Sequence, residues 1–172
     1  MLCFFLFAGI WSAFAQDDIY GLKVGDVAPD FTLTDQNERP FRLSKALEKG
    51  PVVVFFYMTG SREICNKYIK NYQDSLQLIK GKGAQIVGVS PQQESSLLKT
   101  IEKTGATFPL LIDSNKKVCY KYQTLLKEHM ANEEANPVTA VYVIGKDGKV
   151  SYVNFPNTFT VRANVSDFLP FL

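Results

Sequence analysis

The sequence predicts a single α/β domain with a central mixed sheet flanked by helices. Runs of strand-forming residues alternate with segments of helical periodicity along most of the chain. One of the strand runs, residues 52–57, is continuously apolar, as in a strand buried on both faces. At 172 residues the chain suits one hydrophobic core. We expect residues 16–172 to form this one domain.

The first elements are a hairpin and a short helix. Residues 31–34 alternate apolar and polar side chains, which predicts a short edge strand. Residues 41–43 are expected to pair with it across a turn at residues 35–38. Ser44 is then expected to cap a short helix over residues 45–49.

A buried strand and a long helix should follow. The apolar run at residues 52–57 predicts a central strand. Beyond it, five apolar residues recur at helical spacing and predict one helix, which Gly81 and Gly83 end. These residues are Ile64, Tyr68, Tyr72, Leu76 and Ile79.

The rest of the domain repeats this alternation. Ser90, Pro91 and Gln93 form a helix-start signature after a second buried strand at residues 85–90. That helix is expected to end at Gly105. Later strands are expected at residues 108–112, 140–144 and 150–154, the last two as a hairpin. Helices are expected at residues 117–122 and 165–172, with a helical extension plus loop within residues 123–137. Asn164 is expected to be a helix cap in preference to a glycosylation site.

Residues 1–15 have the pattern of a signal peptide. The segment is almost wholly apolar and ends on the small-x-small sequence Ala13, Phe14, Ala15, after which the chain turns polar. The alternative is a buried N-terminal strand or helix. We expect cleavage near Ala15 and export to the periplasm or out of the cell.

Composition excludes several classes of function. The net charge is +2 with scattered lysines, so nucleic acid is not an expected partner. After cleavage the chain keeps Cys65, Cys119 and the sole histidine, His129, which are too far apart in sequence for an ordinary zinc site. We expect no metal, no organic cofactor and no membrane span in the mature chain.

The order of several motifs resembles one family. A central strand, a turn and Cys65 at a helix start resemble the active-site corner of the thioredoxin superfamily. More narrowly, the chain resembles the alkyl hydroperoxide reductase and thiol-specific antioxidant (AhpC/TSA) group in the segments VGDVAPDFTLTD, FFY, GAQIVGVSPQ, FPLLIDSNKKV and VYVIGKDGKV. The resemblance implies a thioredoxin-like fold with an N-terminal peroxiredoxin-type hairpin, a C-terminal hairpin plus helix, and antioxidant thiol chemistry.

The resemblance also assigns candidate catalytic residues. On the peroxiredoxin pattern PxxxTxxC, Cys65 falls on the peroxide-attacking cysteine, Met58 replaces the proline and Arg62 replaces the threonine. On the subgroup pattern RGxWCPxCN, Arg62 falls on the first cysteine, so that CxxC becomes RxxC. Thr139 stands where thioredoxins carry a cis-proline and many peroxiredoxins an arginine. The candidates are therefore Cys65, Arg62 and Thr139.

The expected helix start gives Cys65 a chemical role. Unpaired backbone N–H groups, the helix dipole and nearby Arg62 all favour a thiolate. We expect Cys65 in the first turn, with its sulfur partly open to solvent; the alternative is a small buried apolar residue. Cys119 is expected in the core rather than in a resolving role, and His129 in solvent rather than beside Cys65 as a base.

Three functions compete on these residues. In the first, the Cys65 thiolate attacks a peroxide, becomes a sulfenic acid and is reduced by an external small or protein thiol. In the second, the chain is a catalytically degenerate thioredoxin-fold module that binds a partner protein, since three helper residues are replaced together. The third, thiol–disulfide exchange, is disfavoured because one thiol cannot close a disulfide at the active site.

Overall fold

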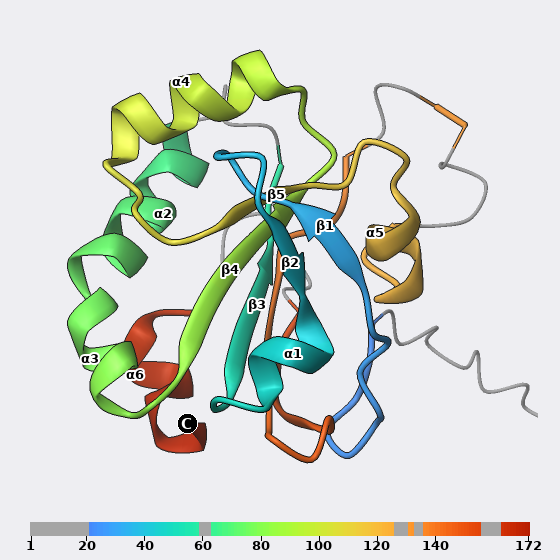
Figure 1. Cartoon of the computed structure of the whole chain (residues 1–172), viewed down its shortest axis with the longest axis vertical. Helices are drawn as coiled ribbons and strands as arrows, with labels where there is room; N and C mark the ends of the chain where they lie inside the picture. Colours follow the sequence, from blue (N-terminus) through green and yellow to red (C-terminus); the bar gives the residue numbers. More distant parts are fainter. Residues whose placement is uncertain (1–20, 59–62, 126–130, 133–135, 156–162) are drawn as a thin grey trace, which may run out of the picture.

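The computed structural model describes most of the predicted domain. The described residues are 21–58, 63–125, 131–132, 136–155 and 163–172. The expected signal peptide, Arg62 and His129 lie outside them, as does much of the extension expected within residues 123–137. Within the described residues, strands and helices alternate as the sequence predicts (Figure 1).

The described strands form one mixed sheet in the order β2-β1-β5-β4-β3-β6-β7 (Figure 1). Strands β3, β4 and β5 are parallel to one another, and the remaining pairs are antiparallel. The strands are β1 (Thr32–Thr34), β2 (Pro40–Arg42), β3 (Val52–Phe56), β4 (Gln85–Ser90), β5 (Leu110–Ile112), β6 (Ala140–Ile144) and β7 (Val150–Asn154). The expected mixed sheet with buried central strands is confirmed.

Helices cover both faces of the sheet. The helices are α1 (Leu43–Leu47), α2 (Glu63–Asp74), α3 (Leu76–Gly81), α4 (Glu94–Thr104), α5 (Lys117–Lys121) and α6 (Val165–Phe168), followed by the 3-10 turn Leu169–Phe171. Helices α2, α3, α4 and α6 lie along one face of the sheet (Figure 1), where their buried side chains join one core. The buried side chains of α1 and α5 belong to the other core. Strand β3 supplies both cores, because successive side chains point to opposite faces.

The N-terminal hairpin forms, but β1 is not the edge strand that the sequence predicts. Its second edge pairs with β5 through Thr34 and Ile112, which leaves β2 at the edge of the sheet. Pro40 explains the order, since a residue without an N–H group suits a strand with one unpaired side. The hairpin thus joins the parallel part of the sheet.

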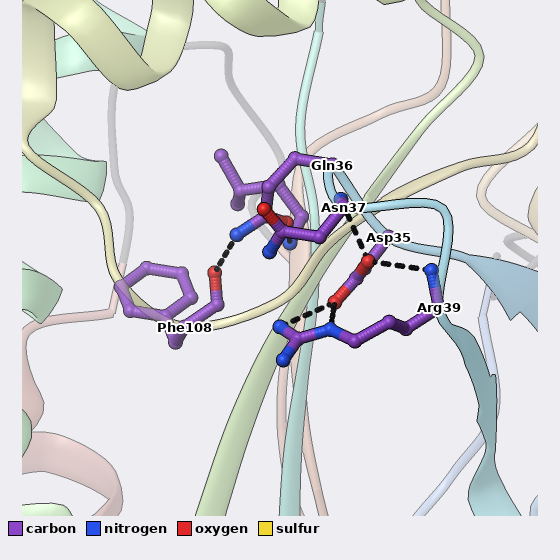
Figure 2. Close-up of polar contacts among 6 residues, drawn as sticks. Asp35, Gln36, Asn37, Arg39 and Phe108 are labelled. Atoms are coloured by element: carbon purple, nitrogen blue, oxygen red, sulfur yellow. Dashed lines mark hydrogen bonds and ion pairs between the residues drawn. The ribbon is translucent and has the colours of Figure 1, made fainter.

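The turn between β1 and β2 is built around one carboxylate (Figure 2). Asp35 accepts hydrogen bonds from the backbone N–H groups of Asn37 (2.8 Å) and Arg39 (2.9 Å), and from the Arg39 guanidinium (2.9 and 3.1 Å). The Gln36 amide donates to the carbonyl oxygen of Phe108 at 3.2 Å. The turn is therefore fixed to the segment that leads into β5.

Two helix starts differ from the sequence prediction. Helix α1 begins at Leu43 rather than at residue 45. The Asp30 carboxylate accepts hydrogen bonds from the Ser44 backbone N–H (2.9 Å) and from the Ser44 hydroxyl (3.0 Å). Asp30, and not Ser44, therefore caps the first turn of the helix. Helix α4 begins at Glu94 rather than after Ser90, because β4 continues through Ser90, whose carbonyl oxygen accepts from the Asp113 N–H at 2.9 Å.

Two of the predicted helices end earlier in the structure than the sequence predicts. The expected helix of residues 64–79 is two helices, broken at Ser75, where φ is −96° and ψ is 7°. The last helix gives way to the 3-10 turn at Leu169, because Pro170 has no N–H group to continue the α-helical pattern. Gly105 ends α4 in the left-handed conformation as predicted, and Asn164 caps α6 through a hydrogen bond between its N–H and Asp167 (2.8 Å).

Candidate active site

Cys65 lies where the sequence predicts, in the first turn of α2, the helix that follows β3. A helix start leaves backbone N–H groups without intrahelical partners, and these groups favour negative charge nearby. Helix α2 spans 12 residues, long enough for its aligned peptide dipoles to act at this end. The position therefore suits a cysteine that reacts as a thiolate.

The expected solvent exposure of Cys65 is wrong. Its side chain is buried, with 1% of the residue exposed, whereas the neighbouring Ile64 is 40% exposed. In the first part of α2 the buried residues are Cys65 and Ile69, each one residue after the expected Ile64 and Tyr68, whereas Tyr72 is buried as expected. The helix therefore turns the sulfur toward the sheet.

The sulfur faces a small pocket between α2 and the sheet. The pocket has a cavity volume of about 20 Å³, room for about one or two water-sized groups. Five aromatic side chains form much of its wall: Phe55, Phe56, Tyr57, Tyr68 and Tyr72. Two polar side chains, Thr139 and Asn154, complete the wall beside Cys65. The enclosure is thus largely apolar but not wholly so.

Thr139 and Asn154, which line this pocket, each carry a buried oxygen without a hydrogen-bond partner. Both Thr139 Oγ1 and Asn154 Oδ1 are buried and have no hydrogen-bond partner. The pairing of Val141 with Asn154 places the start of β6 beside the end of β7, at the same end of the sheet. A buried polar atom left unpaired costs about 1–3 kcal/mol. The structure thus brings Thr139 to the pocket of Cys65, while the role of Asn154 has no signal in the sequence.

A second polar pair that sequence reasoning missed lies beside the sulfur. Tyr57 and Gln92 are buried, and the Gln92 amide donates a hydrogen bond to the Tyr57 hydroxyl oxygen. Burial, and then the proximity of the Cys65 sulfur, raises the pKa of Tyr57 far above its ordinary range. Tyr57 is therefore a neutral phenol next to the thiol. Gln92 follows β4 in a loop, at the end of the segment GAQIVGVSPQ, but the sequence analysis assigns it no role at the site.

Cys119 lies on the other side of the sheet from Cys65. It is fully buried in the core formed with α1, while α2 packs on the opposite core, so the expected core role of Cys119 is confirmed. Burial, and then the nearby Asp113 carboxylate, raises the pKa of Cys119 well above its usual value. The Cys119 thiol is therefore neutral at physiological pH.

Within the described residues, no three histidine, cysteine, aspartate or glutamate side chains gather as they would around a metal ion. Among the same residues, no helix has both the length and the apolar character to cross a membrane.

The sheet order and the thiol at the start of α2 define a thioredoxin-like protein with a peroxiredoxin-type corner. The chain belongs to the AhpC/TSA family, whose model matches residues 24–153. That match covers the hairpin, the parallel strands, Cys65 and the β6–β7 hairpin, and it confirms the resemblance found in the sequence.

Similar proteins are peroxiredoxins by name. Peroxiredoxin Q of rice chloroplasts (Oryza sativa subsp. japonica) is 32% identical over 151 residues, which are 86% of this chain and 65% of that protein. The chain thus spans just under two thirds of the length of the rice protein. Peroxiredoxin Q of Sedum lineare chloroplasts is 33% identical over 151 residues, 86% of this chain and 76% of that one.

Solved structures agree with the fold. Peroxidoxin BcpB of Mycobacterium tuberculosis superposes with a TM-score of 0.77 at 28% identity, covering 87% of this chain and 96% of that chain. A peroxiredoxin-like protein from Aquifex aeolicus superposes with a TM-score of 0.73 at 20% identity, covering 87% and 85% of the two chains. The thioredoxin-like fold expected from the sequence is thereby confirmed.

Proposed function

We propose that this protein is a thiol-dependent peroxidase in which Cys65 alone carries the reaction. The observation that supports this most is the pocket that joins Cys65 to two polar side chains at the start of α2. Membership of the AhpC/TSA family and the likeness to proteins named peroxiredoxins support the same chemistry.

The reaction needs only the thiol, a peroxide and an external reductant. The Cys65 thiolate attacks one peroxide oxygen: a sulfur–oxygen bond forms, the oxygen–oxygen bond breaks, and the leaving oxygen takes up a proton. An external thiol then condenses with the sulfenic acid, releasing water and forming a mixed disulfide. A second thiol restores Cys65 and leaves as the oxidised disulfide.

The separation of the two thiols supports one-cysteine chemistry. Cys119 packs on the core opposite to that of α2, so the sheet lies between them. A disulfide requires Cα atoms within about 7 Å, which this arrangement does not favour. We therefore expect the reductant to come from outside the chain, as a small thiol or a protein thiol.

Arg62 and Thr139 are proposed as helpers of Cys65. Arg62 lies three residues before Cys65 in the sequence, and its positive charge would favour the thiolate. Thr139 supplies a hydroxyl group to the same pocket.

Trapping the sulfenic acid tests the proposal. We expect brief exposure to stoichiometric hydrogen peroxide to add one oxygen to the native chain, and dimedone to capture that state. We expect Cys65→Ser to abolish both the adduct and peroxide consumption with dithiothreitol, and Cys119→Ser to keep them. Equal losses in the two variants would refute one-cysteine chemistry.

The burial of Cys65 favours a second candidate, a catalytically degenerate module that binds a partner protein. An enclosed thiol with altered neighbours suits a retained fold without turnover. The same experiment separates the two: a folded chain that forms no dimedone adduct and consumes no peroxide supports partner binding.

We also propose that residues 1–15 direct export to the periplasm or out of the cell. The apolar segment and the small residues Ala13 and Ala15 support this. Expression of the full chain followed by N-terminal sequencing tests it, with Gln16 expected as the first residue. An uncleaved chain that stays inside the cell would contradict it.

A further inference from the structure

Two residues whose buried oxygens lack hydrogen-bond partners line one pocket from adjacent strand ends. Thr139 is 4% exposed and precedes β6, and Asn154 ends β7. Both line the pocket that holds Cys65, and both Thr139 Oγ1 and Asn154 Oδ1 lack a partner. Polar atoms in this situation are normally paired with protein, water or ligand.

We propose that Thr139 and Asn154 form a hydrogen-bonding site that holds hydrogen peroxide against Cys65 and selects it over bulky organic hydroperoxides. This inference rests on the proposed peroxidase function and assigns its substrate preference to two residues.

The chemistry of the two oxygens matches hydrogen peroxide. The Asn154 carbonyl oxygen can only accept, so it suits a peroxide O–H group. The Thr139 hydroxyl can donate as well, so it can stabilise the negative charge that develops on the leaving oxygen. As the sulfur–oxygen bond forms and the oxygen–oxygen bond breaks, hydroxide leaves, and the proton that the Cys65 thiol released on ionisation converts it to water.

The size of the pocket also favours hydrogen peroxide over bulky organic hydroperoxides. A cavity of about 20 Å³ has room for the two oxygens of hydrogen peroxide but not for a phenyl or tert-butyl group. The aromatic walls, among them Phe55 and Tyr72, come from a β3 strand and an α2 face that are both packed in the core.

Isosteric substitutions test the site in the full chain. We expect Thr139→Val and Asn154→Leu each to lower kcat/KM for hydrogen peroxide about tenfold, the effect of one hydrogen bond. We expect kcat/KM for cumene hydroperoxide to change less than threefold, so that the ratio of the two falls. Thr139→Ser, which keeps the hydroxyl, should retain hydrogen peroxide activity within threefold of the parent.

A matched control separates substrate binding from structural damage. Thr100 is a fully buried threonine of α4 whose hydroxyl donates to the Ser96 carbonyl oxygen, away from the pocket. Thr100→Val should leave both kcat/KM values unchanged. Because Thr139 Oγ1 has no partner to lose, Thr139→Val should not lower the melting temperature, whereas a structural role would lower it.

The possible outcomes distinguish this inference from the function on which it rests. If the parent reduces hydrogen peroxide but Thr139→Val and Asn154→Leu keep kcat/KM within twofold, the binding site is refuted and the peroxidase proposal stands. A parent that prefers cumene hydroperoxide likewise overturns the selectivity alone. A folded parent that consumes no peroxide refutes both.

Discussion

Residues around Cys65 show why position is easier to predict than exposure. The helix start after a buried strand is legible in the sequence, and the structure places Cys65 there. Its burial depends on which residues of α2 face the sheet, and both Ile64 and Cys65 are apolar enough to do so. Because α2 packs against β3 with Cys65 toward the sheet, the Cys65 side chain is buried and Ile64 is exposed. Asn154 and Gln92 reach the site only through tertiary pairing, which no local pattern encodes.

Tyr57→Phe tests the polar pair beside the thiol. The substitution removes the acceptor of the Gln92 amide while both side chains stay buried. We expect the free energy of unfolding to fall by about 1–2 kcal/mol, measured by urea denaturation at pH 7. Tyr120→Phe is the control, because Tyr120 is 41% exposed. Equal stability of Tyr57→Phe and the parent would show that the hydrogen bond contributes nothing net.

The bounds of a helix or strand were predictable where the local sequence determines them. They were not predictable where a residue distant in sequence determines them. Alternation and turn residues predict the β6–β7 hairpin, and Gly105 predicts the end of α4. The start of α1 depends instead on Asp30, which lies outside the helix. The edge position of β2 depends on the contact between β1 and β5, which are far apart in sequence.

The turn between β1 and β2 should make stability depend on pH. Burial alone would raise the pKa of Asp35, but hydrogen bonds from the Arg39 and Asn37 backbone and from the Arg39 guanidinium hold it below its ordinary value (Figure 2). A lowered carboxyl pKa in the folded state stabilises the protein above the unfolded pKa of about 3.9 and loses this effect as pH falls through the folded value.

Asp35→Asn should therefore lower the free energy of unfolding by about 2 kcal/mol at pH 7. The difference from the parent should shrink below about pH 4, as the parent carboxylate is protonated. Urea denaturation across this range measures it. Asp74→Asn is the control, since the ion pair of Asp74 with Lys70 is exposed and contributes little. A constant difference at every pH would mean that the carboxylate charge is not responsible.

At the scale of the whole molecule, the sheet separates the core that contains Cys119 from the core on which α2, the helix of Cys65, packs. The predicted mixed sheet, its buried central strands and its C-terminal hairpin are all present, because apolar runs and turn signals are strong. The side on which each helix packs was not predictable from local pattern. That assignment places α2 on one core and α5 on the other, and so separates Cys65 from Cys119.

This separation predicts that peroxide will not join the two cysteines in the folded chain. A Cys65–Cys119 disulfide would lower the mass by about 2 Da relative to the dithiol, and forming it would require the Cα atoms to approach within about 7 Å. Since the sheet lies between α2 and α5, we expect native protein treated with peroxide, then blocked with iodoacetamide, to lack this species. The same treatment in urea should produce the Cys65–Cys119 disulfide, because the two thiols can meet in the unfolded chain. The Cys119→Ser variant should lack this disulfide under both conditions. A native disulfide between these residues in a peptide map would mean that one helix leaves its core during the reaction, and that Cys119, rather than an external thiol, resolves the sulfenic acid.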